Sequence, residues 1–157
     1  MSQRLGTILR GLALPVRLYL GIVFLVACVY KIAEPGEFAL SIATYDILPL
    51  QLVALMAVVL PWIELVCGLT LILGFWTRAS ALAIAGMMVM FMVALGLALA
   101  RDLQLSCGCF ASAEAGEEIN AGTMLRDGLW LAGALFVTFA DDGRWGLDGL
   151  IRRLRAR

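Results

Sequence analysis

The residues best suited to chemistry in this sequence are Cys107 and Cys109, which are separated only by Gly108. Two thiols at this spacing can close on each other only through a tight turn, and a glycine between them can take the positive φ that such a turn requires. A ring this small would be strained, and strain makes a disulfide easier to reduce. A disulfide that closes so short a loop would also stabilise little. The motif therefore favours a working redox pair over a structural disulfide.

The chain that carries this motif has the composition of a membrane protein. Of its 157 residues, 62% are hydrophobic and 15% are charged, and the mean hydropathy is +0.95. Four nearly uncharged segments, residues 15–32, 50–75, 79–100 and 121–140, are each long enough as helices to cross a ~30 Å hydrocarbon core. The first helix is expected to begin near Pro15, and the outer connection from it to the second helix, which contains Glu34-Pro35-Gly36-Glu37, is expected to be polar and rich in turns. The sequence thus predicts an all-α integral membrane four-helix bundle, one domain over residues 1–157, with the Cys-Gly-Cys loop between helices three and four.

Basic residues divide unequally between the two sides of this predicted bundle. Lys31, Arg101 and Arg126 lie on the side of the Cys-Gly-Cys loop, and the other side carries Arg4, Arg10, Arg17, Arg78, Arg144, Arg152, Arg153, Arg155 and Arg157. Because basic residues gather on the cytoplasmic side, both termini and the basic tail 143–157 are predicted to be cytoplasmic. The loop would then face the periplasm of a bacterial inner membrane, where disulfides persist. Arg17 is expected to snorkel to the inner interface, and the tail to bind anionic lipid.

Several other classes of chemistry are excluded by residues that the sequence lacks. It contains no histidine, which excludes histidine-ligated metals and histidine acid–base catalysis. It has no glycine-rich phosphate loop following a strand. No nucleic acid is expected among its partners. Of the classes of chemistry considered, thiol chemistry is the one that is left.

Five polar or thiol side chains could support the two loop cysteines, namely Cys28, Lys31, Glu64, Arg126 and Asp127. Glu64 is the only acid in the middle of a predicted span, where an ionised group costs about 2.5–3.5 kcal/mol on insertion scales. It should therefore face the bundle interior with a partner or be protonated, and Arg126 is a candidate partner for a structural pair or a proton or quinone site. Cys28 is placed to act as a resolving thiol, although a small buried side chain is the favoured interpretation of Cys28 and Cys67.

Together these residues resemble the MauE-like branch of the DoxX-like membrane proteins, which is named for methylamine utilisation. The most specific matching element is Cys107-Gly108-Cys109-Phe110, which is followed by Ala111 where the family usually has glycine. The other matching elements are Leu20-Gly21, Lys31-Ile32, Pro35, Tyr45, Leu48-Pro49, Leu60-Pro61-Trp62-Ile63-Glu64 and Arg126-Asp127. They span nearly the whole chain.

The resemblance implies an inner-membrane protein that assists the redox maturation of periplasmic proteins. In methylamine utilisation the client would be the disulfide-rich small subunit of methylamine dehydrogenase. The partner would be a periplasmic thioredoxin-like protein. Many MauE-like proteins lie outside methylamine pathways, so the resemblance leaves the client open.

Three functions remain open at this point. In the first, Cys107 and Cys109 shuttle between dithiol and disulfide with the thioredoxin-like partner, and electrons pass on to a quinone in the bilayer. The quinone is the one cofactor considered, and whether the chain is itself an enzyme is left open. In the second, Cys107, Cys109 and Cys28 carry mercuric or cuprous ions, and Cys67 receives them further in. In the third, the chain is a membrane subunit with no chemistry of its own.

Overall fold

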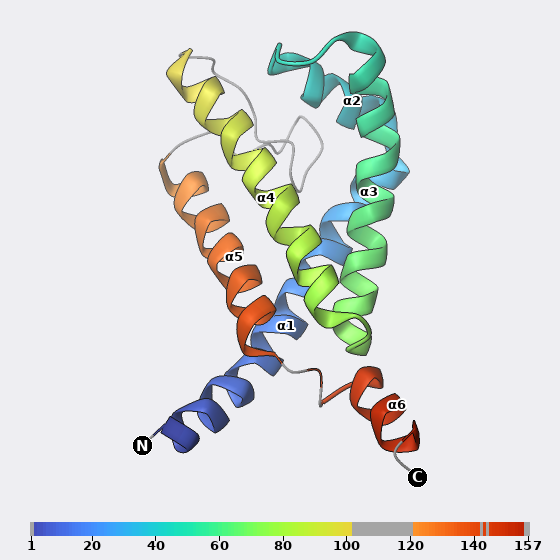
Figure 1. Ribbon diagram of the computed structural model, residues 1–157. Coiled ribbons are helices and arrows are strands. Elements are labelled where there is room, and N and C mark those ends of the chain that lie inside the picture. The colour runs from blue at the N-terminus through green and yellow to red at the C-terminus, as the bar shows by residue number, and fades with distance from the viewer. Residues whose placement is uncertain (1, 102–120, 142, 144, 156–157) are drawn as a thin grey trace.

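The structure of the chain, a computed structural model, describes residues 2–101, 121–141, 143 and 145–155. The described residues form six helices, shown in Figure 1: α1 (Ser2–Ala33), α2 (Pro35–Thr44), α3 (Leu50–Leu73), α4 (Thr77–Ala100), α5 (Ala121–Ala140) and α6 (Leu147–Arg155). The predicted all-α class is confirmed. The Cys107-Gly108-Cys109 loop lies outside the described residues.

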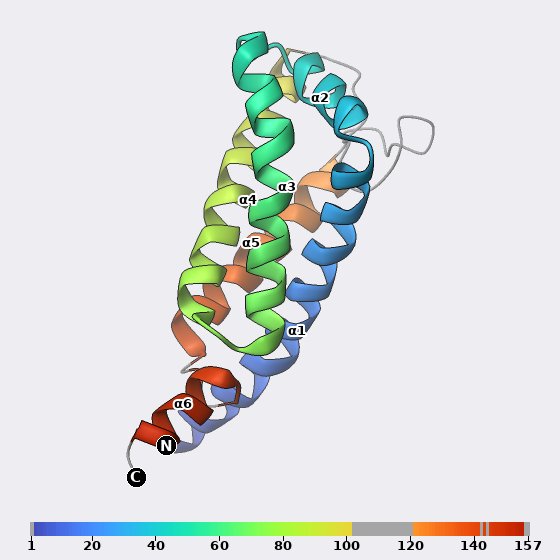
Figure 2. The same cartoon turned by 90° about the vertical axis from the view of Figure 1, so that its right-hand side faces the viewer.

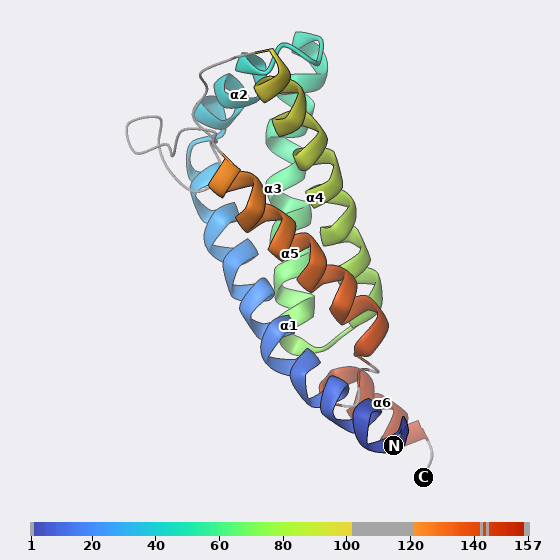
Figure 3. The same cartoon turned by 90° about the vertical axis from the view of Figure 1, so that its left-hand side faces the viewer.

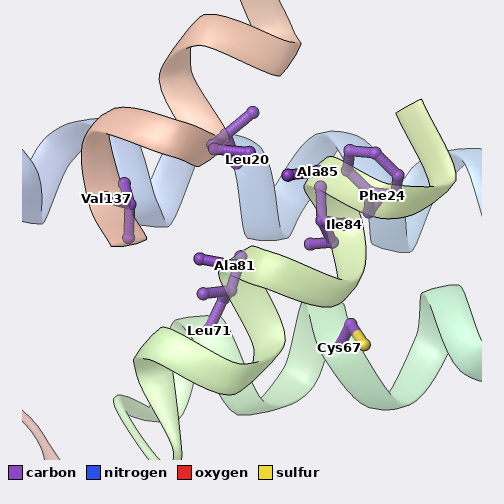
Figure 4. Packing of buried hydrophobic residues seen from close by; sticks show 9 residues of the cluster. Leu20, Phe24, Cys67, Leu71, Ala81, Ile84, Ala85 and Val137 are labelled. Atoms are coloured by element: carbon purple, nitrogen blue, oxygen red, sulfur yellow. The ribbon is translucent and has the colours of Figure 1, made fainter. Parts of the chain in front are cut away.

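The four long helices form a closed ring. α1 packs against α3 and α5, and α4 packs against the same two helices. Accordingly, α3 lies between α1 and α4 in Figure 2, and α5 lies between them in the opposite view of Figure 3. Each helix of the ring contributes to one buried apolar cluster, represented in Figure 4 by Leu20, Leu71, Ile84 and Val137.

A close contact in the ring joins α1 to α3 at two glycines. A Cβ atom added to Gly21 would lie 3.0 Å from the carbonyl oxygen of Gly68 and 2.7 Å from the Ile72 side chain. Small residues at such a crossing allow the two backbones to approach, which favours helix association where lipid tails weaken the hydrophobic drive. The α1–α3 pair therefore forms a close-packed wall of the ring.

Three helical segments are long and apolar enough to cross a membrane: Leu9–Ala33, Leu50–Leu73 and Thr77–Ala100. Their outward faces carry large apolar side chains that are more than half exposed, such as Leu55, Val66 and Leu82. A soluble protein would seldom expose so much apolar surface, whereas lipid would cover it. α5 packs alongside but is not among the three, so a bundle of four membrane-crossing helices stays a prediction.

Two predictions about the helices are wrong. The first helix begins well before Pro15 and continues through it. This is possible because a proline removes only one backbone donor, and its neighbours in a long helix hold the chain in place. The outer connection, expected to be turn-rich, contains α2. Pro35 starts this helix, since its fixed φ suits a first helical position.

Arg17 is buried against the connection between α5 and α6, so the prediction that its charged end reaches the inner interface is wrong. Its Nη1 donates to Asp141 Oδ2 at 2.9 Å, and its Nη2 donates to the Trp145 carbonyl at 2.7 Å. The chain after α5 folds back over the end of the ring where both termini lie, and the Asp148 N–H donates to the Gly74 carbonyl at 3.0 Å. The α5–α6 connection thus supplies partners that hold the guanidinium inside.

Candidate functional site

A mainly apolar cavity of about 380 Å³ is the candidate site in the described part of the chain. Its walls come from α1, α2, α3, α4 and α5. α3 and α4 diverge from the short turn that joins them, as Figure 1 shows, and α2 lies at the open end of the divergence. The cavity occupies this wider half of the ring, where the α3 wall includes Leu60 and the α4 wall includes Ala94.

Aromatic side chains and methionines make up much of the wall of the cavity. Its aromatic residues are Phe24, Phe38, Tyr45, Phe91 and Trp130, and its methionines are Met56, Met87, Met88 and Met90. Aromatic faces stack on flat molecules, and methionine side chains adapt their shape to what they contact. Such a wall suits a flat apolar ligand.

A buried ion pair forms the polar part of the cavity. Lys31 Nζ lies 2.7 Å and 2.9 Å from the two carboxylate oxygens of Glu64, and the two side chains are only 10% and 6% exposed. The ammonium also lies 5.1 Å from the centre of the Phe38 ring. Glu64 therefore faces the interior and has a partner, as its depth in the span required.

The hypothesis from the sequence that Glu64 pairs with Arg126 is wrong. α2 folds between α1 and α3 at the far end of the ring, so the last turn of α1 lies level with the middle of α3 and Lys31 reaches Glu64. Arg126 instead pairs with its neighbour Asp127 at 3.2 Å. Its guanidinium also lies 4.9 Å from the centre of the Trp130 ring.

Asp127 and Tyr45 bring further polar groups to the same cavity. Both side chains are buried, and both line the wall. Burial of the hydroxyl, assisted by the negative charge of Asp127, raises the pKa of Tyr45 to about 12. The phenol therefore stays protonated at neutral pH and keeps its O–H as a hydrogen-bond donor.

The two cysteines that the structure describes are packed as small buried side chains. Cys28 is fully buried, and its Sγ donates to the Leu25 carbonyl at 3.1 Å. Cys67 belongs to the apolar cluster together with Leu71 and Ile84. Neither forms a disulfide with another described residue. The roles predicted for Cys107 and Cys109 concern residues outside the described ones and stay predictions.

Residues of α2 are the part of the site that the sequence analysis missed. Phe38 and Ser41 reach the cavity because the outer connection is helical. The signal that could have revealed this helix is Pro35 followed by a mainly apolar run without glycine or proline after Gly36. Within the described ranges, no group of three or more His, Cys, Asp or Glu residues could hold a metal ion.

Comparison with known proteins gives the family. No solved structure matches the chain. It is 31% identical over 93 residues to methylamine utilization protein MauE of Methylophilus methylotrophus. That match covers 59% of this chain and 49% of the relative, so it spans about half the relative's length. The family described as methylamine utilisation protein MauE matches residues 9–140. Because this match takes in most of the sequence, the chain belongs to the MauE family.

Proposed function

We propose that the chain is an inner-membrane thiol–disulfide accessory protein of methylamine utilisation. It would support the redox maturation of periplasmic proteins together with a thioredoxin-like partner, as in maturation of the methylamine dehydrogenase small subunit. The observation that carries this proposal is the MauE family match over residues 9–140, a range that includes Cys107-Gly108-Cys109. Placement in a wider DoxX-like group is a further prediction.

The proposed exchange passes through a mixed disulfide. The Cys109 thiolate attacks a disulfide of the partner, so that one S–S bond forms between the two proteins and the partner's own bond breaks. The Cys107 thiolate then attacks the Cys109 sulfur, closes the Cys107–Cys109 disulfide and releases the partner as a dithiol. The loop loses two electrons and the partner gains them, and the reverse sequence returns them. In that reverse sequence a thiolate of the partner attacks the loop disulfide, and Cys109 is taken as the attacked sulfur, which carries the mixed disulfide in both directions, because Phe110 beside it offers an apolar surface for docking.

Removing the resolving thiol should trap the partner. Cys107→Ser is expected to accumulate a covalent complex with a periplasmic thioredoxin-like protein, because the mixed disulfide at Cys109 then has no second thiol to open it. Cys109→Ser should trap less. The measurement is a non-reducing gel of cells grown on methylamine, with mass spectrometry of the band that disappears on reduction. Cys67→Ser, which changes a thiol of the apolar core, is the matched control and should trap nothing.

The same variants separate the proposal from its two alternatives. If neither loop variant, alone or combined with Cys28→Ser, captures a protein, the exchange mechanism is wrong. Binding of cuprous or mercuric ion by the purified chain, lost in the Cys107→Ser/Cys109→Ser variant, would then favour a soft-metal carrier. Full maturation of the client in that double variant would instead favour a membrane subunit without chemistry.

The orientation in the membrane is part of the proposal. In the structure the two termini lie at one end of the helix ring, and α2 lies at the other (Figure 1). The excess of basic residues on the side of the termini supports a cytoplasmic location for them. A reporter active only in the cytoplasm should therefore give a signal when fused to the C-terminus and none when inserted within residues 112–118. The opposite pattern would place the loop thiols in a reducing compartment and contradict the proposed function.

A further inference from the structure

The charges around the cavity favour a neutral ligand. Three charged side chains line it, Lys31, Glu64 and Asp127. Among the described residues, Lys31 pairs with Glu64, and Asp127 pairs with Arg126, which lies behind the wall. Each pair sums to zero formal charge. A ligand with its own net charge, such as a fatty acid anion, would enter this apolar space without compensation, which is costly. The cavity is thus suited to a molecule without net charge.

Hydrogen-bond donors in the cavity favour a ligand that carries acceptors. An ammonium has three N–H groups, and among the described residues that of Lys31 bonds only the two Glu64 oxygens. This leaves one N–H for a ligand oxygen. A pure hydrocarbon would leave that buried donor without an acceptor, whereas a carbonyl oxygen would satisfy it. The ligand should therefore present a carbonyl-like acceptor near Lys31.

Size and wall composition favour a flat ring. The volume of about 380 Å³ falls within the roughly 300–1,000 Å³ typical of small-molecule sites. Phe38, Phe91 and Trp130 contribute aromatic rings to the wall, and aromatic rings can stack on a flat molecule. A planar head group with ring carbonyls fits this combination better than a flexible acyl chain does.

The edge of the cavity reaches the outer surface of the helix ring. Met90 and Val93 of α4 line the cavity and are 43% and 58% exposed, and Ile47 after α2 is 39% exposed. Because α4 belongs to a segment long and apolar enough to cross a membrane, this edge would face lipid. An apolar tail attached to the ring could extend from it into the bilayer.

From these observations we propose that the cavity binds the head group of an isoprenoid quinone. The inference deepens the proposed function and rests on it for its role in the reaction. Closing the Cys107–Cys109 disulfide from the dithiol forms one S–S bond and releases two electrons and two protons. A quinone that takes up both becomes the quinol, so the quinone is reduced while the dithiol is oxidised. The loop would then be ready to accept electrons from its partner again.

Filling the cavity should strongly weaken binding of the probe ubiquinone-1. The full chain, purified in detergent, is titrated with ubiquinone-1, and binding is read from quenching of tryptophan fluorescence, since Trp130 lines the cavity. Ala94→Phe, which adds a ring inside the cavity, is expected to weaken binding by at least about tenfold. Val89→Phe is the matched control, because Val89 lies on α4, is 49% exposed and is not part of the wall. It should change binding by less than about twofold.

Each other outcome counts against the inference. Non-saturating quenching, or equal weakening by Ala94→Phe and Val89→Phe, would overturn it, as would displacement of ubiquinone-1 by equimolar oleate, which would indicate a lipid site. If Ala94→Phe does not fold, Ala94→Leu against Val89→Leu repeats the comparison with a smaller addition. The Cys107→Ser/Cys109→Ser variant should still bind ubiquinone-1. Absence of partner trapping by Cys107→Ser and Cys109→Ser, with intact quinone binding, would therefore contradict only the exchange function, and partner trapping without quinone binding would contradict only the quinone site.

Discussion

Replacing Lys31 with methionine is expected to destabilise the folded chain by about 3–5 kcal/mol, because it leaves the Glu64 carboxylate buried without its partner. The carboxylate is only 6% exposed and its two oxygens both accept hydrogen bonds from the ammonium. Glu64→Leu should cost a similar amount, since it strands the ammonium instead. Unfolding by a denaturing detergent in mixed micelles measures these differences.

The double variant Lys31→Met/Glu64→Leu provides the decisive comparison. It removes both charges and replaces them with apolar side chains, so it should recover most of the stability lost by either single variant. Glu37→Gln serves as a control, because Glu37 is an exposed acid of α2, and it should change stability by less than about 0.5 kcal/mol. Additive losses in the double variant would show that the two residues are not coupled.

Recovery of stability in the double variant without recovery of ubiquinone-1 binding would separate two roles of the ion pair. If the double variant folds but no longer binds ubiquinone-1, the ion pair contributes to ligand binding rather than to folding alone. This result is expected, because methionine offers no N–H to a carbonyl oxygen. The contribution of the ion pair to stability can then be separated from its contribution to ligand binding.

Replacing Gly74 with alanine is expected to undock α6 from the ring. Gly74 has φ +67°, where an L-residue costs about 1–2 kcal/mol. Its new Cβ would also lie 2.7 Å from the Cα of Gly146 and 3.1 Å from a guanidinium nitrogen of Arg17. Backbone atoms cannot move aside as a flexible side chain can. The chain around Gly146 should therefore shift, and the hydrogen bond from the Asp148 N–H to the Gly74 carbonyl should be lost.

Limited proteolysis and amide hydrogen exchange would detect this undocking. The amides of α6 should exchange faster in Gly74→Ala, and a protease should cut sooner between α5 and α6. Gly86→Ala is the matched control. Gly86 lies within α4 with open space around it, so the change should stabilise the helix by up to about 1 kcal/mol. Equal effects of the two variants on α6 would contradict the close backbone contact.

Local features of the sequence were enough to predict the class of the fold and most helix ends. Long apolar runs indicate helices that lipid can surround. Pro49 precedes α3 and Gly74 follows it, and proline and glycine commonly mark the beginning and the end of a helix. The predicted bounds of the second, third and fourth long helices differ from the structure by two residues at most, because such signals act over a few residues. The family could likewise be predicted from short motifs such as Leu60-Pro61-Trp62-Ile63-Glu64.

Only the tertiary structure decided which residues meet. The pairing of Lys31 with Glu64 depends on the level at which α1 ends beside α3, and α2 sets that level. The burial of Arg17 depends on the return of the chain after α5. The cavity exists because α3 and α4 diverge while α1 and α5 hold the ring closed. All three features are distances between segments far apart in the chain, and such distances follow from helix packing rather than from any local residue pattern.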